Sequence, residues 1–203
     1  MSTHRDSTVI RRARLGDVPT IARIWRAGWI DGHAGNVPAD LVRHRCGEQF
    51  AGRAQRRLGW SWVATSDDLV VGFVVVVGDE VEQLYVDRAE RGSGVAAVLL
   101  RTAETAIRAG GHQRGWLAVV AGNRRARAFY TREGWHDSGL IAYEAETEDG
   151  SFTVPSHRYE IDLRGDHPDC GGLRALTTRR SSRRVGVAWS PLEAFQPAPA
   201  VDD

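Results

Sequence analysis

The stretch Val81–Glu104, VEQLYVDRAERGSGVAAVLLRTAE, largely determines the expected fold. Its first part alternates apolar and polar residues, which is typical of a strand. From Val95 onward apolar residues recur at helical spacing, until a pair of glycines ends the pattern. The turn between the two, RGSGVA (Arg91–Ala96), is rich in glycine. Backbone N–H groups in the first turn of a helix lack internal partners, and the helix dipole adds positive charge there. We therefore expect this turn to bind a phosphate or pyrophosphate group.

Patterns on either side of this stretch predict strands and helices in the order β-α-α-β-β-β-α-β-α-β-β. Short turns join the three strands before the glycine-rich turn, which indicates an antiparallel meander. The order is that of an α/β (or α+β) domain with helices packed on a sheet. The expected elements are a strand at 8–14, helices at 15–30 and 40–56, strands at 60–66, 69–78 and 80–87, a helix at 95–110, a strand at 116–121, a helix at 124–132 and a hairpin at 140–163.

Composition is that of one domain with an appended segment. The chain has 203 residues, of which 42% are apolar and 26% charged, enough for a sizeable core. After Leu163 the periodicity stops, and Arg, Ser, Pro and Gly dominate. We expect a domain at 1–163 and a largely disordered C-terminal extension at 164–203.

Charge and cysteine content exclude several classes of partner. The net charge of +1 argues against nucleic acid as a binding partner. The arginines within 179–184 are interpreted as a charged, solvent-exposed run. Two cysteines make no disulfide framework, and no signal peptide or bilayer-length apolar stretch is evident. The expectation is a cytoplasmic protein with no membrane partner. Neither His33 nor the segment DHPDCGG (166–172) has metal-ligand spacing, so no metal is expected.

Two other phosphate-binding loops do not fit the glycine-rich turn. A Walker loop needs a lysine, and all 27 basic residues counted as Lys or Arg are arginine. The dinucleotide fingerprint tolerates Ala97 at its third glycine, but it belongs to the first strand of a parallel βαβ unit. Here the strand is the fourth, within a predicted antiparallel meander.

Two segments in order, LYVDRAERGSGVAAVLL and LAVVAGNRRARAFYTREGW, resemble the GNAT superfamily of acyl-CoA-dependent N-acetyltransferases. The family has an R/Q-x-x-G-x-G/A turn after a strand, then an Asn and a Phe-Tyr pair in the next strand–helix unit. The matching residues are Arg91, Gly94, Ala96, Asn123, Ala126, Phe129, Tyr130 and Gly134. The resemblance covers about residues 8–163 and implies a mixed, mostly antiparallel sheet of six to seven strands flanked by helices.

The resemblance implies that acetyl-CoA is the cosubstrate and that its pyrophosphate occupies the glycine-rich turn. The pantetheine arm is then expected to lie along the strand Glu82–Val86 and to pair with its backbone. The coenzyme-binding residues implied in this way are Leu84, Tyr85, Val86, Arg91, Gly92, Ser93, Gly94, Val95, Ala96, Asn123 and Tyr130. Asn123 also suits a helix cap, and the two roles are compatible.

Acetyl transfer needs a base for the amine, a donor for the oxyanion and an acid for the departing thiolate. By resemblance Tyr130 is the acid, although it also reads as a core aromatic beside Phe129. The backbone N–H of Leu84 is the implied oxyanion donor. Glu80 and Glu82 are the two candidates for the base. We favour Glu82 because a carboxyl deeper in the strand has a raised pKa.

The acceptor pocket of this fold lies beneath the first helices and their loop. Trp29, Asp31 and His33 are candidate acceptor contacts, with other tryptophans of the seven near them. Aromatic walls and a carboxylate suit a cationic amine. We predict acetylation of a primary amine on a small molecule by direct attack. A protein N-terminal or lysine acetyltransferase, and a non-catalytic acyl-CoA sensor, are the alternatives. Family members often form homodimers, so a homodimer is a further expectation.

Overall fold

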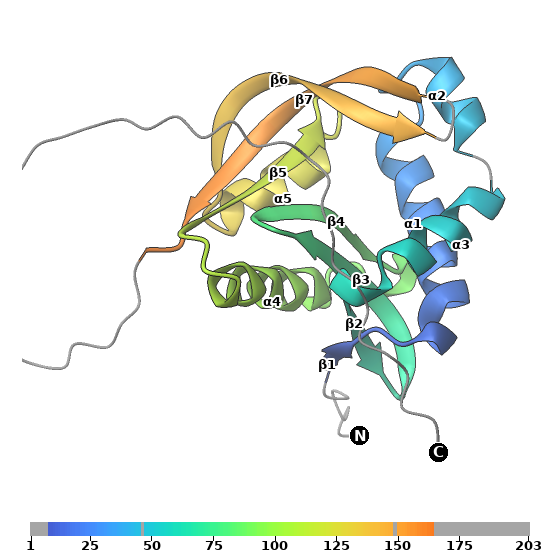
Figure 1. Cartoon of the computed structure of the whole chain (residues 1–203), viewed down its shortest axis with the longest axis vertical. Helices are drawn as coiled ribbons and strands as arrows, with labels where there is room; N and C mark the ends of the chain where they lie inside the picture. The colour runs from blue at the N-terminus through green and yellow to red at the C-terminus, as the bar shows by residue number, and fades with distance from the viewer. Residues whose placement is uncertain (1–7, 46, 148–149, 165–203) are drawn as a thin grey trace, which may run out of the picture. The chain divides into compact units, whose positions relative to one another are not determined.

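The computed structural model describes residues 8–45, 47–147 and 150–164. Within them a seven-stranded mixed sheet lies between two groups of helices, as predicted (Figure 1). The strand order is β1-β2-β3-β4-β5-β7-β6, and only the β4–β5 pair is parallel. The strands are β1 (Val9–Arg12), β2 (Ser61–Ser66), β3 (Leu69–Val77), β4 (Glu80–Val86), β5 (Arg114–Val120), β6 (His136–Thr147) and β7 (Gly150–Asp162). No helix of the described residues is long and apolar enough to cross a membrane.

Helices cover both faces of the sheet and enclose a separate hydrophobic cluster on each. On one face Leu99, Ala103 and Ile107 of α4 pack against the sheet, together with residues of α5. On the other face Ile21, Trp25 and residues of α2 and α3 form the second cluster. The helices are α1 (Val18–His33), α2 (Ala39–His44), α3 (Gly47–Arg56), α4 (Val95–Ala109) and α5 (Arg124–Arg132), with short 3-10 turns at Leu15–Asp17, Leu58–Trp60 and Arg88–Glu90.

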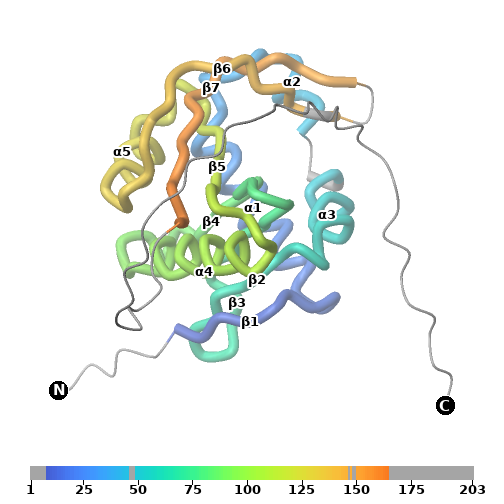
Figure 2. Tube along the Cα trace, turned by 60° about the vertical axis from the view of Figure 1, so that its left-hand side comes forward, coloured from blue at the N-terminus to red at the C-terminus, as the bar shows by residue number. Residues whose placement is uncertain are grey.

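The predicted second helix at 40–56 is two helices, α2 and α3. The other elements occur in the predicted order. Figure 2 shows the long β6–β7 hairpin passing over the top of the sheet towards α2. The two elements meet where the His44 and Phe152 rings lie 5.3 Å apart. Cys46 and the predicted extension, apart from Arg164, lie outside the described residues.

Strand β4 carries the irregularity that positions the site. Val75 pairs with Gln83, whereas Val76 pairs with Val81, so Glu82 is an extra residue in the strand, a β-bulge. The bulge reverses the alternation of side chains. Val81 and Leu84 therefore both pack on the α4 side. The simple alternation that would place Glu82 and Leu84 on one face does not hold.

Strands β4 and β5 pair only at their beginnings. The register contains the single pair Glu80–Trp116, and the Trp116 amide donates to the Asp79 carbonyl at 2.9 Å. Beyond this point the strands separate, as Figure 1 shows. The backbone of the remaining β4 residues has no strand partner on that side, which leaves hydrogen-bonding groups at the edge of a gap inside the sheet.

Candidate active site

Two cavities meet at the gap between β4 and β5. The central cavity, of about 680 Å³, lies among α1, α3, β4 and the β6–β7 hairpin. The turn cavity, of about 370 Å³, lies at the glycine-rich turn before α4. Both volumes fall within or near the range of small-molecule sites, roughly 300–1,000 Å³. The residues that line both cavities are Leu84, Tyr85, Asn123, Ala126 and Tyr130.

Backbone geometry prepares the turn cavity for an anion. Gly92 and Gly94 line it in left-handed conformations, with φ of 88° and 94°. A Cβ on either glycine would meet nothing within 4 Å, so the space beside them is open. The amides of Ala97 and Val98 donate to the Gly94 carbonyl. The amides that precede them in the first turn of α4 are thus placed to serve a ligand.

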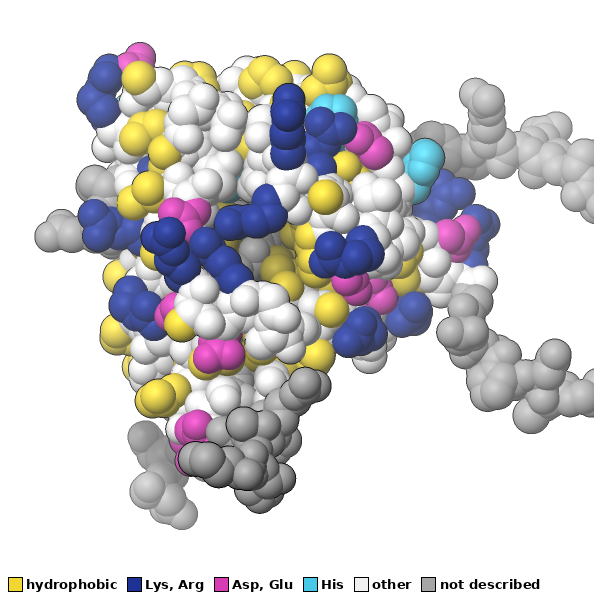
Figure 3. All heavy atoms as spheres, turned by 180° about the vertical axis from the view of Figure 1, so that it is seen from behind, with side chains coloured by type: hydrophobic (Ala, Val, Ile, Leu, Met, Phe, Trp, Pro, Cys, Tyr) yellow, Lys and Arg dark blue, Asp and Glu magenta, His cyan; other side chains and the backbone are white. Residues whose placement is uncertain are grey.

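Side chains at the turn cavity add positive charge. Arg91, Arg125 and Arg132 line it together with Glu90 and Glu133, so arginines outnumber carboxylates among the described lining residues. Viewed from behind, the described surface carries many arginine side chains around a hollow (Figure 3). Ser93 and Val95, expected at the coenzyme site, do not line the cavity. The Ser93 hydroxyl donates to the Glu90 carbonyl at 2.7 Å, and the Val95 side chain is buried in the core.

Asp31, expected beside an acceptor, lies instead at the glycine-rich turn. Its carboxylate accepts from the Arg91 guanidinium at 2.7 Å, and this hydrogen bond lowers the pKa of Asp31. Asp31 does not line the central cavity. The ion pair links the end of α1 to the turn and holds Arg91 near the cavity mouth.

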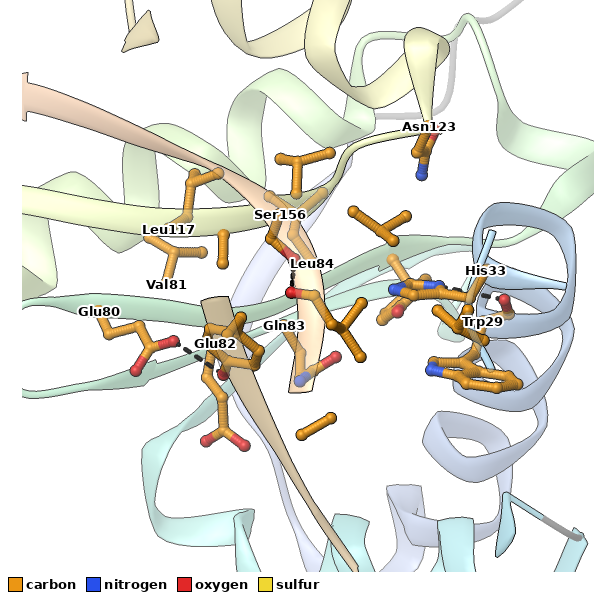
Figure 4. Close-up of a pocket in the computed structure, with 18 of the residues that line it drawn as sticks. Trp29, His33, Glu80, Val81, Glu82, Gln83, Leu84, Leu117, Asn123 and Ser156 are labelled. Carbon is orange, nitrogen blue, oxygen red and sulfur yellow. Dashed lines mark hydrogen bonds between the residues drawn. The ribbon is translucent and has the colours of Figure 1, made fainter. Parts of the chain in front are cut away.

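Asn123 and Tyr130 come from the strand–helix unit β5–α5. The Asn123 Oδ1 accepts from the Ala126 amide at 3.1 Å, so the side chain caps α5 as predicted. Figure 4 shows it projecting towards the central cavity. The Tyr130 ring packs on Phe129, Trp135 and Tyr159. Its hydroxyl has no hydrogen-bond partner among the described residues, and burial raises the pKa of Tyr130, so the phenol stays protonated.

Glu80 lines the central cavity at the start of β4 (Figure 4). Its Oε1 accepts a hydrogen bond from the Tyr143 hydroxyl of the hairpin at 3.2 Å. Burial, and to a smaller extent the charge of Glu82, raises the pKa of Glu80 to about 7. A carboxyl with such a pKa is partly ionised near neutral pH and can both accept and release a proton.

Glu82, the bulge residue, lines the same cavity but has a different environment. Its Oε2 accepts from Arg57 Nε at 2.7 Å, and its side chain is only 11% exposed. The guanidinium compensates the charge of this carboxylate. Sequence reasoning favoured Glu82 as the base because of its depth in the strand; the carboxyl with the raised pKa is that of Glu80.

Trp29 and His33 stand at the helical wall of the central cavity, across from the two carboxyls (Figure 4). Their rings stack with centroids 5.2 Å apart. Burial lowers the pKa of His33 to about 4, so the ring is neutral at pH 7. His33 Nδ1 lies 3.1 Å from the Trp29 carbonyl and donates to it in the neutral ring. Nε2 is left as a hydrogen-bond acceptor.

Of the described tryptophans, Trp29 alone lines the central cavity, and the phenol rings that line it are those of Tyr85, Tyr130 and Tyr143. Trp25 is fully buried in the core, Trp60 is 46% exposed, and neither lines the central cavity. The cavity is lined instead by four arginines, which sequence reasoning did not assign to the site: Arg45, Arg53, Arg56 and Arg57. Three of them follow one another closely around the end of α3, and this spacing was the only signal available.

Among residues 8–45, 47–147 and 150–164, no group of three or more His, Cys, Asp or Glu side chains could hold a metal ion.

A comparison with protein-family models matches residues 30–135, just over half of the chain, to the acetyltransferase (GNAT) family. The chain belongs to the GNAT acetyltransferase family. The matched region extends from the end of α1 to Trp135 and contains the glycine-rich turn, both β4 carboxyls, Asn123 and Tyr130. A search of curated proteins found no match.

Solved GNAT structures share the fold. A GCN5-related N-acetyltransferase from Rhodopseudomonas palustris superposes with a TM-score of 0.61 at 19% identity, over 80% of this chain and 100% of that one. The structure of yncA from Salmonella typhimurium, solved with its cofactor acetyl-CoA, superposes with a TM-score of 0.58 at 14% identity, over 81% of this chain and 99% of that one. The PaiA N-acetyltransferase of Thermoplasma acidophilum, in complex with coenzyme A, superposes with a TM-score of 0.55 at 19% identity, over 77% of this chain and 99% of that one. At these low identities, the TM-scores above 0.5 show a shared fold.

Proposed function

We propose that this GNAT protein transfers an acetyl group from acetyl-CoA to the primary amine of a small molecule by direct attack. The observation that carries the proposal is the meeting of two cavities at Leu84 and Tyr130, with Glu80 in one and the glycine-rich turn in the other. A coenzyme in the turn cavity would bring its thioester to the place that an acceptor reaches from the central cavity. Two substrates could then react without a covalent enzyme intermediate.

Acetyl-CoA fits the turn cavity by charge and by shape. Its pyrophosphate would take the amides between Gly94 and Ala97 in the first turn of α4, with Arg91 beside them. The pantetheine amides would pair with the unpartnered edge of β4 from Leu84 to Val86, as an added strand does. Asn123, at the opposite wall of the gap, would contact the arm near the thioester.

Glu80 is the proposed base. An alkylammonium ion has a pKa near about 10, so most of the acceptor arrives protonated at neutral pH. Glu80, with its pKa raised to about 7, takes one proton from the ammonium group directly or through a water molecule. That proton leaves to solvent, and the neutral amine can attack the thioester carbon.

Leu84 and Tyr130 are the proposed partners of the reacting group. Attack forms the C–N bond and places negative charge on the carbonyl oxygen, which the Leu84 N–H would stabilise. As the intermediate collapses, the C–S bond breaks, and the second proton of the nitrogen passes, directly or through water, to Tyr130, where it replaces the proton that Tyr130 gives to the sulfur. Tyr130, protonated and without a partner among the described residues, would donate a proton to the departing sulfur. The products are the acetylated amine and coenzyme A as its free thiol.

The hairpin over the central cavity favours a small acceptor. Tyr143, Ala145 and Val154 of β6 and β7 line the cavity, and Val37 and Leu41 near α2 line it too. The hairpin contacts α2 at His44 and Phe152. A peptide chain would have to pass this contact, whereas a small amine fits beneath it.

Free-thiol release from acetyl-CoA, measured against a panel of amines, tests the proposal. The panel contains polyamines, aminoglycosides, amino acids and short peptides with free N-termini. Turnover with small amines is the expected result. Turnover with peptides alone would assign the protein to protein modification. If coenzyme A raises the melting temperature and no amine gives thiol, the protein is a coenzyme sensor and the proposal fails.

A further inference from the structure

The central cavity is basic as well as acidic. Four arginines, Arg45, Arg53, Arg56 and Arg57, face three carboxyls, those of Glu80, Glu82 and Glu144. Glu82 is paired with Arg57. Glu144 is on the exposed side of the hairpin, where Ser151 and Thr153 each donate to it at 2.7 Å. Glu80 carries only part of a charge near pH 7. Among the described residues, Arg53 and Arg56 thus add positive charge to the α3 side of the cavity besides the Arg57–Glu82 pair.

Arg53 stands out within this group. Its guanidinium lies over the Trp25 ring, 4.7 Å from the centroid. It forms no ion pair with any residue in the described part of the chain. Burial lowers the pKa of Arg53, so holding this cation in the cavity wall costs free energy. A half-buried guanidinium that lines a cavity and forms no ion pair with a described residue is well suited to a carboxylate or phosphate brought by a ligand.

The position of Arg53 relates it to the proposed base. Arg53 interacts electrostatically with Glu82 and with Tyr143, and Tyr143 donates to Glu80. The cation and the base thus face the same chamber from α3 and from β4 and the hairpin. A molecule with an ammonium group at one end and an anionic group at the other would match both.

We infer that the acceptor is a small amine that also carries a carboxylate, of the amino-acid type, and that Arg53 binds this carboxylate while the amine faces Glu80. This inference rests on the proposed function and replaces the cationic acceptor expected from the sequence. The covalent chemistry is unchanged, because the carboxylate is bound and does not react.

Matched pairs of acceptors test the inference. Each pair keeps the amine and side chain and removes the acid: phenylalanine and phenethylamine, β-alanine and ethylamine, and phosphoethanolamine and ethanolamine for the phosphate case. A hydrogen-bonded charge pair contributes roughly tenfold or more to binding. Wild-type protein should show a kcat/KM at least about tenfold higher for the carboxylate member. Arg53→Gln should bring that ratio towards one, mainly through KM, with little change for the uncharged member.

Arg26→Gln is the matched control, because it removes the same charge from an exposed position that lines neither cavity. It should leave the preference intact. A wild-type preference for the amine without the acid, or a ratio that Arg53→Gln does not alter, would overturn the inference. Preference for phosphoethanolamine alone would overturn the assignment to a carboxylate.

A binding measurement separates this inference from the proposed function. With coenzyme A present, the melting temperature should rise more with the amino acid than with the matched amine. Arg53→Gln should abolish that difference. A larger shift with the amino acid that Arg53→Gln abolishes would support the inference even if no amine released thiol. Absence of thiol release would contradict the proposed catalysis and leave the binding inference standing. Equal shifts for both members of every pair would overturn the inference.

Discussion

At the scale of single residues, the catalytic proposal depends on the protonation of Glu80. With a pKa raised to about 7, this carboxyl is protonated at lower pH and ionised above it, so a base in this position should give a rate that rises with pH through about 7. Glu80→Gln should remove this limb from kcat in saturating amine and lower kcat by roughly 10²-fold or more. Rates measured between pH 5.5 and 8.5 test this. Retention of the limb in Glu80→Gln would exclude Glu80 as the base.

Tyr130 should act at the sulfur. Tyr130→Phe removes the hydroxyl, keeps the ring that packs on Trp135 and Tyr159, and should lower kcat by roughly 10²-fold with little change in coenzyme A affinity. Stopped-flow thiol release and calorimetric binding of coenzyme A separate the two quantities. Tyr159→Phe is the control, since Tyr159 is a buried neighbour that lines neither cavity. An unchanged kcat in Tyr130→Phe would remove Tyr130 from the mechanism.

At the scale of secondary-structure elements, the glycine-rich turn depends on its left-handed backbone. An alanine at Gly94 would clash with nothing, yet its φ of 94° is strained for a residue with a Cβ, at a cost of about 1–2 kcal/mol. If the turn relaxes to relieve the strain, its amides turn away from the ligand. We therefore expect Gly94→Ala to weaken coenzyme A binding roughly 5- to 30-fold.

Gly139→Ala is the matched control for the turn. Gly139 has a φ of 105°, an equally open Cβ position and no place in either cavity. The Gly139→Ala variant should lose about as much folding stability as Gly94→Ala, and its affinity for coenzyme A should be unchanged. Calorimetric titration of both variants makes the comparison, and equal affinity losses in the two would show that the turn plays no special part.

The contact between α1 and β4 depends on another glycine. A Cβ at Gly28 would overlap the ring of Tyr85, which is already packed against Trp25 and Phe73. Overpacking of this kind costs about 1–3 kcal/mol, although Gly→Ala within a helix ordinarily stabilises. Gly28→Ala should lower the free energy of unfolding in urea. Gly52→Ala in α3, where the nearest atom is the end of the Arg56 side chain at 3.4 Å, should not. A stabilised Gly28→Ala would contradict the described packing.

The order of the secondary-structure elements could be predicted from the sequence more easily than the contacts between these elements. Periodicity and the glycine-rich turn predicted the order of strands and helices, because these signals are local. The bulge at Glu82 has no such signal, since it depends on how β3 pairs with β4. The raised pKa of Glu80 comes mainly from burial by elements distant in sequence, among them the hairpin, whose Tyr143 lies 63 positions away, so it could not be read from the residues beside Glu80 in the chain.

At the scale of the whole molecule, the helices and the hairpin surround an opening in the sheet with two cavities that share lining residues. The separation of β4 and β5 beyond Glu80 leaves the gap. α4 supplies the turn on one side, and α1, α3 and the hairpin enclose the other. The residues around the central cavity also depend on tertiary packing: Asp31 pairs with Arg91 at the glycine-rich turn, whereas the arginines around α3 line the cavity beside Trp29 and His33.

Initial-velocity kinetics with both substrates varied test the central claim of direct transfer between two cavities most directly. The best amine of the panel and acetyl-CoA are each varied at several fixed concentrations of the other. Direct attack in a ternary complex predicts double-reciprocal lines that intersect. Parallel lines, the pattern of a ping-pong reaction through an acetylated side chain, would contradict the account.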